Sequence, residues 1–397
     1  MSKKKSSISR PWMDSSKTIE QRVEMLISEM TLEEKVSQMG ASYFGDIVST
    51  DTDDTADPNV QTTSAKKVSS RKSKLIFDPV KMKKVVDMLG TGLLQNFVWH
   101  SFENPEDTIE VYIKMVNDAQ KYLVENTRLG IPAIITTEGI HGHWAPEATI
   151  FPHSIAIASS CDPSLVRKMG AIAAKEARAA GAAQFFSPVL ELAREPRWSR
   201  MQESYGEDPY LVEVMAVEFI KGVQGEGPYV DDEHCAATAK HYVAHGSPEG
   251  GLNHGPVSVG NREMKQMFLR PFEAAVKKAG VLSVMPAYHE IDGVPLACHY
   301  EYLTKVLRHE WGFQGYTYSD WGAVEMLNTR HFVAPTLEQA GKMALEAGMD
   351  VDAPVKSYGR RLVDMVKQGK VDISYIEQAV RRILRLKFIL RLFENPY

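Results

Sequence analysis

Residues 315–322 read Gly315-Tyr316-Thr317-Tyr318-Ser319-Asp320-Trp321-Gly322 and predict one short strand that stops abruptly. Two tyrosines around a threonine suit a pleated, half-buried strand, and a glycine punctuates each end. A carboxylate and an indole, Asp320 and Trp321, follow where the strand stops. A lone aspartate in such a place is often a cap or turn residue. In a parallel barrel, however, catalytic groups sit at the C-terminal ends of the strands, so the fold of the remaining chain decides between the two interpretations.

Strand and helix patterns alternate over most of the chain. The predicted strands cover residues 92–98, 132–137, 184–189, 237–243, 281–288, 315–321 and 349–352. The predicted helices cover residues 107–125, 163–180, 263–278, 302–311 and 337–347, and two further helices close the chain. Such alternation implies a parallel sheet. We therefore predict an α/β fold, a (β/α)8 TIM-type barrel with seven or eight strands. The alternative is an open doubly wound sheet, although no G-x-G-x-x-G follows the first strand.

The start of the chain predicts two helices and then a polar insertion. Apolar spacing predicts a helix from Ile19 to Met30, and Thr31 with Glu34 forms a capping box that opens a second helix. From about residue 43 to 74 the sequence is rich in Ser, Thr, Asp and Lys, which predicts a surface insertion. The 397 residues otherwise fit one large barrel domain, residues 1–397.

Composition excludes several classes of partner. The chain is 44% hydrophobic with a net charge of −5, which argues against nucleic-acid or anionic-membrane binding. No apolar run approaches a membrane span, and no apolar core follows the basic start, so we expect no secretory signal. Three cysteines, Cys161, Cys235 and Cys298, lack metal-site spacing and cannot all pair. They predict reduced thiols in a cytoplasmic protein.

Polar residues gather at the predicted strand ends. They are Glu138 with His141, Arg200, Lys240 with His241, Tyr288, and Asp320 with Trp321. Taken singly, Lys240 could be a snorkelling surface lysine and His241 a satisfied core histidine. Together, carboxylates, cations and aromatic rings suit a polyhydroxylated ligand, because charged groups make strong hydrogen bonds to hydroxyls. No phosphate loop or metal-ligand motif competes with this interpretation, so we expect no cofactor and no metal.

With these residues assembled, the chain resembles the N-terminal barrel domain of family 3 glycoside hydrolases, the β-glucosidase and β-xylosidase group. The resemblance runs from about Met30 to the last residue. Its motifs are Glu138-x-x-His141-Gly142, Pro196-Arg197-Trp198-Ser199-Arg200, Tyr205-Gly206-Glu207-Asp208-Pro209, Lys240-His241, Pro248-Glu249-Gly250-Gly251 and Ser319-Asp320-Trp321.

The resemblance implies a role for each of these site residues. Asp320 would be the nucleophile of an exo-acting, retaining β-glycosidase that releases terminal β-D-glucosyl or β-D-xylosyl residues. The residues that line the non-reducing sugar subsite would be Glu138, Arg200, Lys240, His241 and Tyr288. Trp321 would form the floor of the entrance to that subsite. Such an enzyme needs a second acidic group to protonate the leaving oxygen, and no metal or organic cofactor.

Two departures from the family pattern concern single residues. Ser199 stands where glycine is usual, a change that could shift Arg200. Glu138 stands where many glucosidases have aspartate. Its longer side chain would crowd a sugar's C6 hydroxymethyl group, which favours pentosides.

The third departure concerns the acid/base. Relatives with the Pro248–Gly251 pattern usually continue into a sandwich domain that supplies a glutamate, which we expect to be absent from this chain. Single-domain β-N-acetylglucosaminidases instead carry an Asp-x-His dyad, and here Leu252 stands at the position of the aspartate before His254. A histidine without its orienting carboxylate is a poor acid, so His254 is either the acid/base or an ordinary loop residue at the sugar rim.

Three hypotheses remain open at this point. The chain works with a separate sandwich domain or a second copy of itself, it uses His254 alone, or it is a non-catalytic sugar-binding protein. Retention of Asp320 favours the first two, since a binding protein needs no nucleophile.

Overall fold

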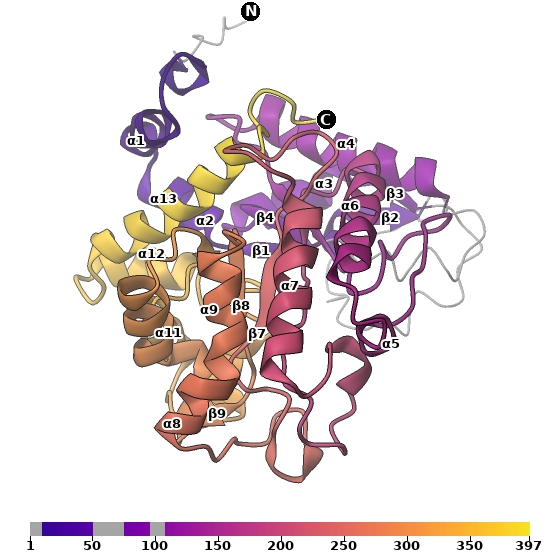
Figure 1. Cartoon of the computed structure of the whole chain (residues 1–397). Helices are drawn as coiled ribbons and strands as arrows, with labels where there is room; N and C mark the ends of the chain where they lie inside the picture. Colours follow the sequence, from indigo (N-terminus) through magenta and orange to yellow (C-terminus); the bar gives the residue numbers. More distant parts are fainter. Residues whose placement is uncertain (1–9, 51–74, 96–107) are drawn as a thin grey trace, which may run out of the picture.

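The computed structural model describes residues 10–50, 75–95 and 108–397 (Figure 1). Seven of the strands in the described residues build two parallel sheets, and the others form the antiparallel pairs β2 (Val48–Thr50) with β3 (Leu75–Phe77) and β9 (Glu290–Ile291) with β10 (Val294–Pro295). The first parallel sheet has the order β1 (Ala41–Tyr43), β4 (Leu93–Gln95), β5 (Ile134–Thr137) and β6 (Gln184–Phe185). The second has the order β7 (Thr238–Tyr242), β8 (Ser283–Pro286) and β11 (Tyr316–Thr317). Every pairing within these two sheets is parallel, so the predicted α/β class is confirmed.

Single parallel bridges join the two sheets at both edges. Gln184 pairs with Ala236 at one edge. At the other edge Tyr318 pairs with Val351, and Gly40 pairs with Asp352. The predicted strand at 349–352 is therefore present only as these bridges, and closure into one barrel stays a prediction.

β6 and β8 are shorter than their sequence patterns, and a proline lies at or just after the end of each. β6 ends at Phe185, shortly before Pro188, and β8 ends at Pro286. Proline has no N–H to donate to a ladder. The chain thus leaves the sheets early, and the following residues form the loops that carry the site.

Helices cover the outside of the sheets. They are α1 (Ile19–Glu29), α2 (Leu32–Gln38), α3 (Pro79–Asp87), α4 (Ile109–Asn126), α5 (Ser154–Ala158), α6 (Pro163–Ala179), α7 (Pro209–Gln224), α8 (Asn261–Glu263), α9 (Leu269–Lys277), α10 (Ala323–Thr329), α11 (Leu337–Ala347), α12 (Arg360–Lys367) and α13 (Ile373–Ile389). Figure 1 shows α7 and α9 in front of β7 and β8, and α6 packs beside α7. The capping box of Thr31 and Glu34 is confirmed at the start of α2.

Two predicted helices contain wider, π-type turns. Residues 301–310 form one such segment. Residues 264–268 form another, immediately before α9. Pro271 in α9 explains the second, because a proline removes one i→i−4 hydrogen bond and clashes with the preceding turn.

The predicted insertion at about 43–74 lies mostly outside the described residues. Its first residues are not polar surface, since Phe44, Ile47 and Val48 are buried in a second apolar cluster. There β2 pairs antiparallel with β3.

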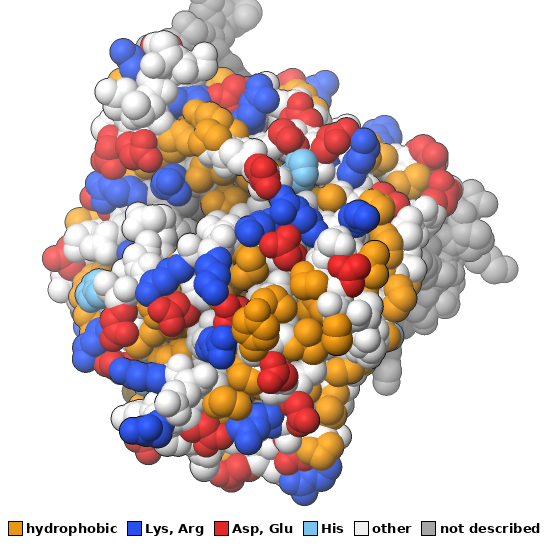
Figure 2. Space-filling model, viewed as in Figure 1, with side chains coloured by type: hydrophobic (Ala, Val, Ile, Leu, Met, Phe, Trp, Pro, Cys, Tyr) orange, Lys and Arg blue, Asp and Glu red, His pale blue; other side chains and the backbone are white. Residues whose placement is uncertain are grey.

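The surface carries mixed charges. Figure 2 shows Lys and Arg interspersed with Asp and Glu on the face viewed, with apolar side chains between them. A stripe of positive charge, the electrostatic footprint of a nucleic-acid-binding protein, is absent from this face. Within the described residues, none of the helices has the length and apolarity needed to cross a membrane.

Candidate active site

Asp320 follows β11 at the start of a tight connection to α10. Its Oδ1 accepts the backbone N–H of Trp321 at 2.8 Å. Its Oδ2 is buried and accepts no hydrogen bond from the described residues, although it lies 3.7 Å from Nε2 of His241. Gly322 has φ +79°, a left-handed conformation that favours glycine, as it begins the helix. The local sequence thus presents one carboxylate oxygen that protein hydrogen bonds leave free.

Arg200 and His241 meet beside Asp320. Nη2 of Arg200 lies 3.0 Å from Nε2 of His241. A guanidinium can only donate, so Nε2 accepts, and the ring proton of neutral His241 sits on Nδ1. Burial lowers the pKa of His241 well below its usual range, and the nearby charge of Arg200 adds to this effect. His241 is therefore a neutral imidazole with a defined tautomer.

A carboxylate holds Arg200 in place. Glu203 accepts two hydrogen bonds from Arg200, at 2.8 and 2.9 Å. Burial alone would lower the pKa of Arg200, but the bonds to Glu203 and the charge of Asp320 raise it above its usual value. Arg200 thus pairs with Glu203, and the same guanidinium also contacts His241 in the site. Ser199 is exposed, and serine at this position does not prevent Arg200 from contacting His241.

Lys240 and Glu138 form an ion pair inside the site, with 3.0 Å between Nζ and Oε2. Lys240 is only 2% exposed, so the alternative of a snorkelling surface lysine is wrong. Burial raises the pKa of Glu138, and Lys240 opposes that rise. The pair brings together strand ends that are 102 residues apart in the sequence.

Tyr288 and His254 lie ring to ring, with centroids 4.6 Å apart. Burial, followed by the negative charge of Asp320 and the contact of the Tyr288 hydroxyl with that carboxylate, raises the pKa of Tyr288 far above its usual value. His254 is half-buried, and burial followed by the charge of Arg330 lowers its pKa. No carboxylate of the described chain lies within ion-pair distance of His254. The structure therefore places His254 at the site but favours its uncharged form at neutral pH.

The remaining predicted residues lie at the rim. Trp321 packs edge-on against Tyr43, with ring centroids 5.9 Å apart and the indole partly exposed. His141 lies against His153 at 4.2 Å between centroids. Burial, followed by the effect of His153, lowers the pKa of His141.

Several residues of the site escaped the sequence interpretation. They are Glu191, His245 and His289, all fully buried. His289 stacks on His245 with 5.4 Å between centroids, and burial lowers its pKa to about 3. A carboxylate in the apolar run Leu190-Glu191-Leu192 was a usable signal for Glu191, because a charge within such a run needs a buried partner. The sequence contains no comparable signal for His245 and His289, apart from their positions near Lys240-His241 and Tyr288.

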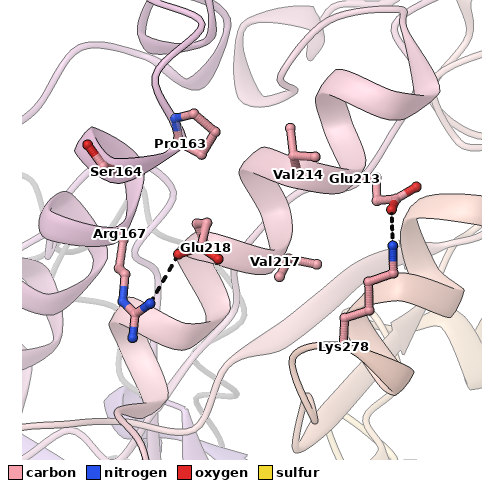
Figure 3. A pocket seen from close by; sticks show the side chains of 8 residues that line it. All are labelled: Pro163, Ser164, Arg167, Glu213, Val214, Val217, Glu218 and Lys278. Carbon is pink, nitrogen blue, oxygen red and sulfur yellow. Dashed lines mark hydrogen bonds and ion pairs between the residues drawn. The ribbon is translucent and has the colours of Figure 1, made fainter.

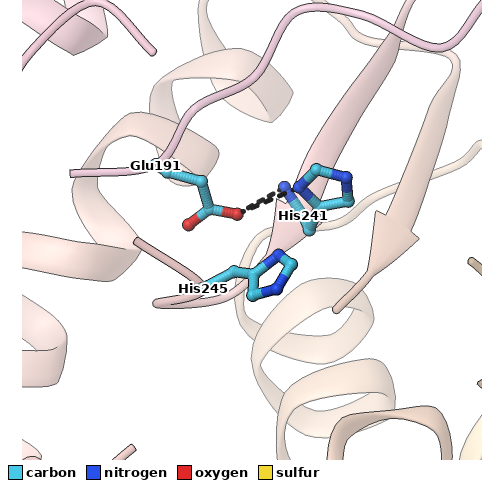
Figure 4. Close-up of side chains that lie close together, drawn as sticks. All are labelled: Glu191, His241 and His245. Atoms are coloured by element: carbon cyan, nitrogen blue, oxygen red, sulfur yellow. Dashed lines mark hydrogen bonds and ion pairs between the residues drawn. The ribbon is translucent and has the colours of Figure 1, made fainter. Parts of the chain in front are cut away.

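Among the described residues, Glu191, His241 and His245 are close enough to raise the question of a metal (Figure 4). Nε2 of His245 lies 2.7 Å from the carbonyl oxygen of Asn253 and must donate to it, which leaves a lone pair on Nδ1. Nδ1 of His241 instead carries the proton, because Arg200 occupies the other nitrogen. A cation would need the lone pair that this proton occupies, so the three residues do not fit a metal.

Two surface hollows lie away from the predicted site residues. One groove of about 480 Å³ runs between α6 and α7, where Arg167 pairs with Glu218 and Glu213 with Lys278 (Figure 3). Another hollow, of about 640 Å³, is lined by arginines that pair with carboxylates. There Asp350 alone holds Arg308 and Arg382, each at 2.7 Å. These ion pairs indicate packing rather than chemistry.

Comparison with known proteins identifies related sequences. Residues 31–386 match the glycosyl hydrolase family 3 N terminal domain. A protein of Formosa agariphila named putative beta-xylosidase is 36% identical over 392 residues, covering 98% of this chain and 48% of that protein. A beta-xylosidase of the same organism is 40% identical over 283 residues, covering 68% of this chain and 39% of that protein. The chain thus spans about half or less of the length of these relatives.

Solved structures give a concordant result. A β-glucosidase from Erythrobacter marinus superposes with a TM-score of 0.84 at 32% identity, covering 98% of this chain and 47% of that one. The β-glucosidase of Listeria innocua in complex with isofagomine gives 0.77 at 30% identity, covering 95% of this chain and 47% of that one.

Proposed function

Because this chain belongs to glycosyl hydrolase family 3, we propose that it is the nucleophile-bearing part of an exo-acting, retaining β-glycosidase. Its substrates are terminal, non-reducing β-D-xylosyl or β-D-glucosyl residues of oligosaccharides or glycosides. The observation that carries this proposal is Asp320, whose Oδ2 is free of protein hydrogen bonds beside Arg200 and His241. A retaining glycosidase needs one carboxylate oxygen that is available to attack the anomeric carbon.

The chemistry assigns a role to each residue. Oδ2 of Asp320 attacks the anomeric carbon while the bond to the leaving oxygen breaks and that oxygen takes a proton. Water then attacks the covalent glycosyl-enzyme and restores the carboxylate, with retention at the anomeric carbon. Arg200 and Lys240 donate hydrogen bonds to sugar hydroxyls, and Glu138 accepts them. Trp321 covers the C–H face of the ring at the entrance.

The proposal includes one barrel domain. Parallel bridges at both edges of the two sheets support closure into a TIM-type (β/α)8 barrel. In that arrangement the residues after β5, β7, β8 and β11 share the C-terminal face, where such barrels carry their active sites. The close pairs of Lys240 with Glu138 and of His241 with Asp320 support this placement.

For the sugar we favour xylosides. Glu138 is held by Lys240, and its length would crowd a C6 hydroxymethyl group, which a pentoside lacks. Two relatives named beta-xylosidases, at 36% and 40% identity, support this choice. Other relatives are named beta-glucosidases, so a glucoside is the alternative.

The acid/base is proposed to come from outside the described site. His254 is nearby, but burial and Arg330 lower its pKa, so it carries little proton at neutral pH. A sandwich domain outside these 397 residues, or else a second copy of this chain, is the proposed source. A single-domain enzyme of the β-N-acetylglucosaminidase kind, with His254 as the acid, is the alternative. A cytoplasmic location is proposed from the unpaired cysteines.

The test uses a substrate that needs no acid. The purified chain is mixed with 2,4-dinitrophenyl β-xyloside, and release of dinitrophenolate is followed beside the Asp320→Asn variant. Wild type should release dinitrophenolate and accumulate a covalent adduct detectable by mass spectrometry, whereas the variant should do neither. Binding of xylose without any release or adduct would instead favour the sugar-binding hypothesis.

A further inference from the structure

Glu191 is a buried carboxyl group that the proposed reaction does not use directly. It lies after β6 and is only 1% exposed. One of its oxygens, Oε1, accepts the backbone N–H of His241 at 2.7 Å, and the other accepts that of Gly246 at 3.3 Å. Glu191 therefore ties the end of β7, where His241 lies, to Gly246 beyond the turn that carries His245. Figure 4 shows Glu191 between the two histidines.

The same carboxyl faces the ring of His241. Oε1 of Glu191 lies 3.4 Å from Nδ1 of His241 and faces it, although Nδ1 makes no hydrogen bond to any described residue. On the other side of the ring, Nε2 accepts from Arg200 at 3.0 Å and lies 3.7 Å from Oδ2 of Asp320. A carboxyl oxygen facing Nδ1 favours a proton there, and Arg200 requires Nε2 to be unprotonated. Both contacts thus select one tautomer and one orientation of the ring.

The turn is tied to the rim loop as well. His245 donates from Nε2 to the carbonyl of Asn253 at 2.7 Å, and Asn253 also accepts from Trp198 at 3.2 Å. The ring of His245 lies edge-on to His241, at 4.9 Å between centroids. Displacement of the turn would therefore move His241 and the segment before His254 together.

Fold stability does not explain why a carboxyl group is buried at position 191. An apolar residue would fill the space without the desolvation that raises the pKa of this carboxyl to about 8. Among the described residues, its oxygen atoms accept hydrogen bonds from backbone N–H groups, and Oε1 also faces the ring of His241. The site residue that Glu191 contacts most directly is His241.

We propose that Glu191 is a positioning residue of the sugar site: it fixes His241 as the Nδ1–H tautomer, with Nε2 turned toward Arg200 and Asp320. This inference rests on the proposed glycosidase function. Glu191 itself touches no reacting atom. Its effect passes through His241, much as an orienting carboxylate selects the tautomer of a catalytic histidine in serine proteases.

The experiment compares three variants of the chain with wild type. Glu191→Met removes both acceptors at similar length, and Glu191→Gln keeps Oε1 as an acceptor. Glu213→Met is the matched control, because Glu213 is a buried glutamate on α7 that pairs with Arg270 and Lys278 on the outer surface. Histidine tautomers are measured in ¹⁵N-histidine-labelled protein by long-range ¹H–¹⁵N spectra, with His241 assigned from a His241→Gln sample.

The expected result is a change confined to the Glu191 variants. Glu191→Met should shift the His241 signals away from the Nδ1–H pattern and lower kcat/KM for dinitrophenyl β-xyloside about 10- to 100-fold. Glu191→Gln should fall between Glu191→Met and wild type, whereas Glu213→Met should keep wild-type kcat/KM and His241 signals. If Glu191→Met does not fold, the same comparison is made with Glu191→Gln.

Two outcomes separate the inference from the function. Unchanged His241 signals and kcat/KM in both Glu191 variants would overturn the positioning role while the glycosidase stands. An inactive wild type would overturn the glycosidase proposal. The tautomer measurement would still report whether Glu191 holds His241.

Discussion

Lys387 is a buried amine that should weaken the fold at neutral pH. It lies on α13, is 0% exposed, and donates to Oε1 of Gln38 at 2.5 Å. Burial lowers its pKa from 10.5 to about 7. That difference corresponds to a penalty of about 5 kcal/mol on the charged form in the folded state, at about 1.4 kcal/mol per pKa unit.

The sign of the pH dependence follows from this lowered pKa. Between pH 7 and 10.5 the unfolded chain binds more protons at this lysine than the folded chain does. The free energy of unfolding therefore rises with pH across that window through this group. Below pH 7 both states are charged, and the full penalty applies.

The perturbation is Lys387→Met, which keeps the length of the side chain and removes the amine. At pH 7 the lost penalty of several kcal/mol outweighs the unpaired Oε1 of Gln38, which costs about 1–3 kcal/mol. We expect a net gain of about 2–4 kcal/mol in the free energy of unfolding. The gain should shrink as pH rises toward 10.

The assay is urea unfolding of wild type and variant at several values between pH 6.5 and 9.5. Lys367→Met is the control, because Lys367 is largely exposed and pairs with Glu33, and a surface ion pair contributes at most about 1 kcal/mol. A Lys387→Met protein that is less stable than wild type at pH 7 would refute the reasoning. So would an unchanged difference between wild type and variant across the pH range.

The remaining predictions concern the site. Asp320→Asn should lower kcat on an aryl β-glycoside by about a thousandfold or more while the circular dichroism stays native; a purified variant with most of its activity would exclude Asp320 as nucleophile. Glu138→Asp should raise the ratio of kcat/KM for aryl β-glucoside over β-xyloside by about tenfold, since space for one methylene group discriminates by about that much; an unchanged ratio would contradict the steric argument. With the acid/base absent, dinitrophenyl β-xyloside should react at least 10²- to 10⁴-fold faster than xylobiose. Efficient cleavage of xylobiose by the dilute chain alone would place the acid within it and make His254→Ala the next variant.

The sequence alone determined the fold class and named most residues of the candidate site. Strand and helix periodicities are local properties, so the alternation from residue 92 onward predicted a parallel α/β fold, and Thr31 with Glu34 predicted the start of α2. Because parallel strands deliver their C-terminal ends to one face, strand ends alone selected Glu138, Lys240, His241 and Asp320. Strand lengths were predicted less well, since β6 and β8 end early, at or just before a proline.

Tertiary structure decided how those residues are paired, protonated and held. Lys240 with Glu138, and Arg200 with His241, are contacts across 102 and 41 residues. These contacts depend on how the loops leave the sheets, and no local sequence pattern encodes that geometry. The same holds for Glu191: only packing shows that a carboxyl within an apolar run lies behind His241. Burial also changes the charge expected for a residue type, because desolvation lowers the pKa of Lys387 to about 7 and keeps His241 uncharged. The sequence names the titratable groups, but the dielectric surroundings and hydrogen-bond partners that set their charge exist only once the chain is folded.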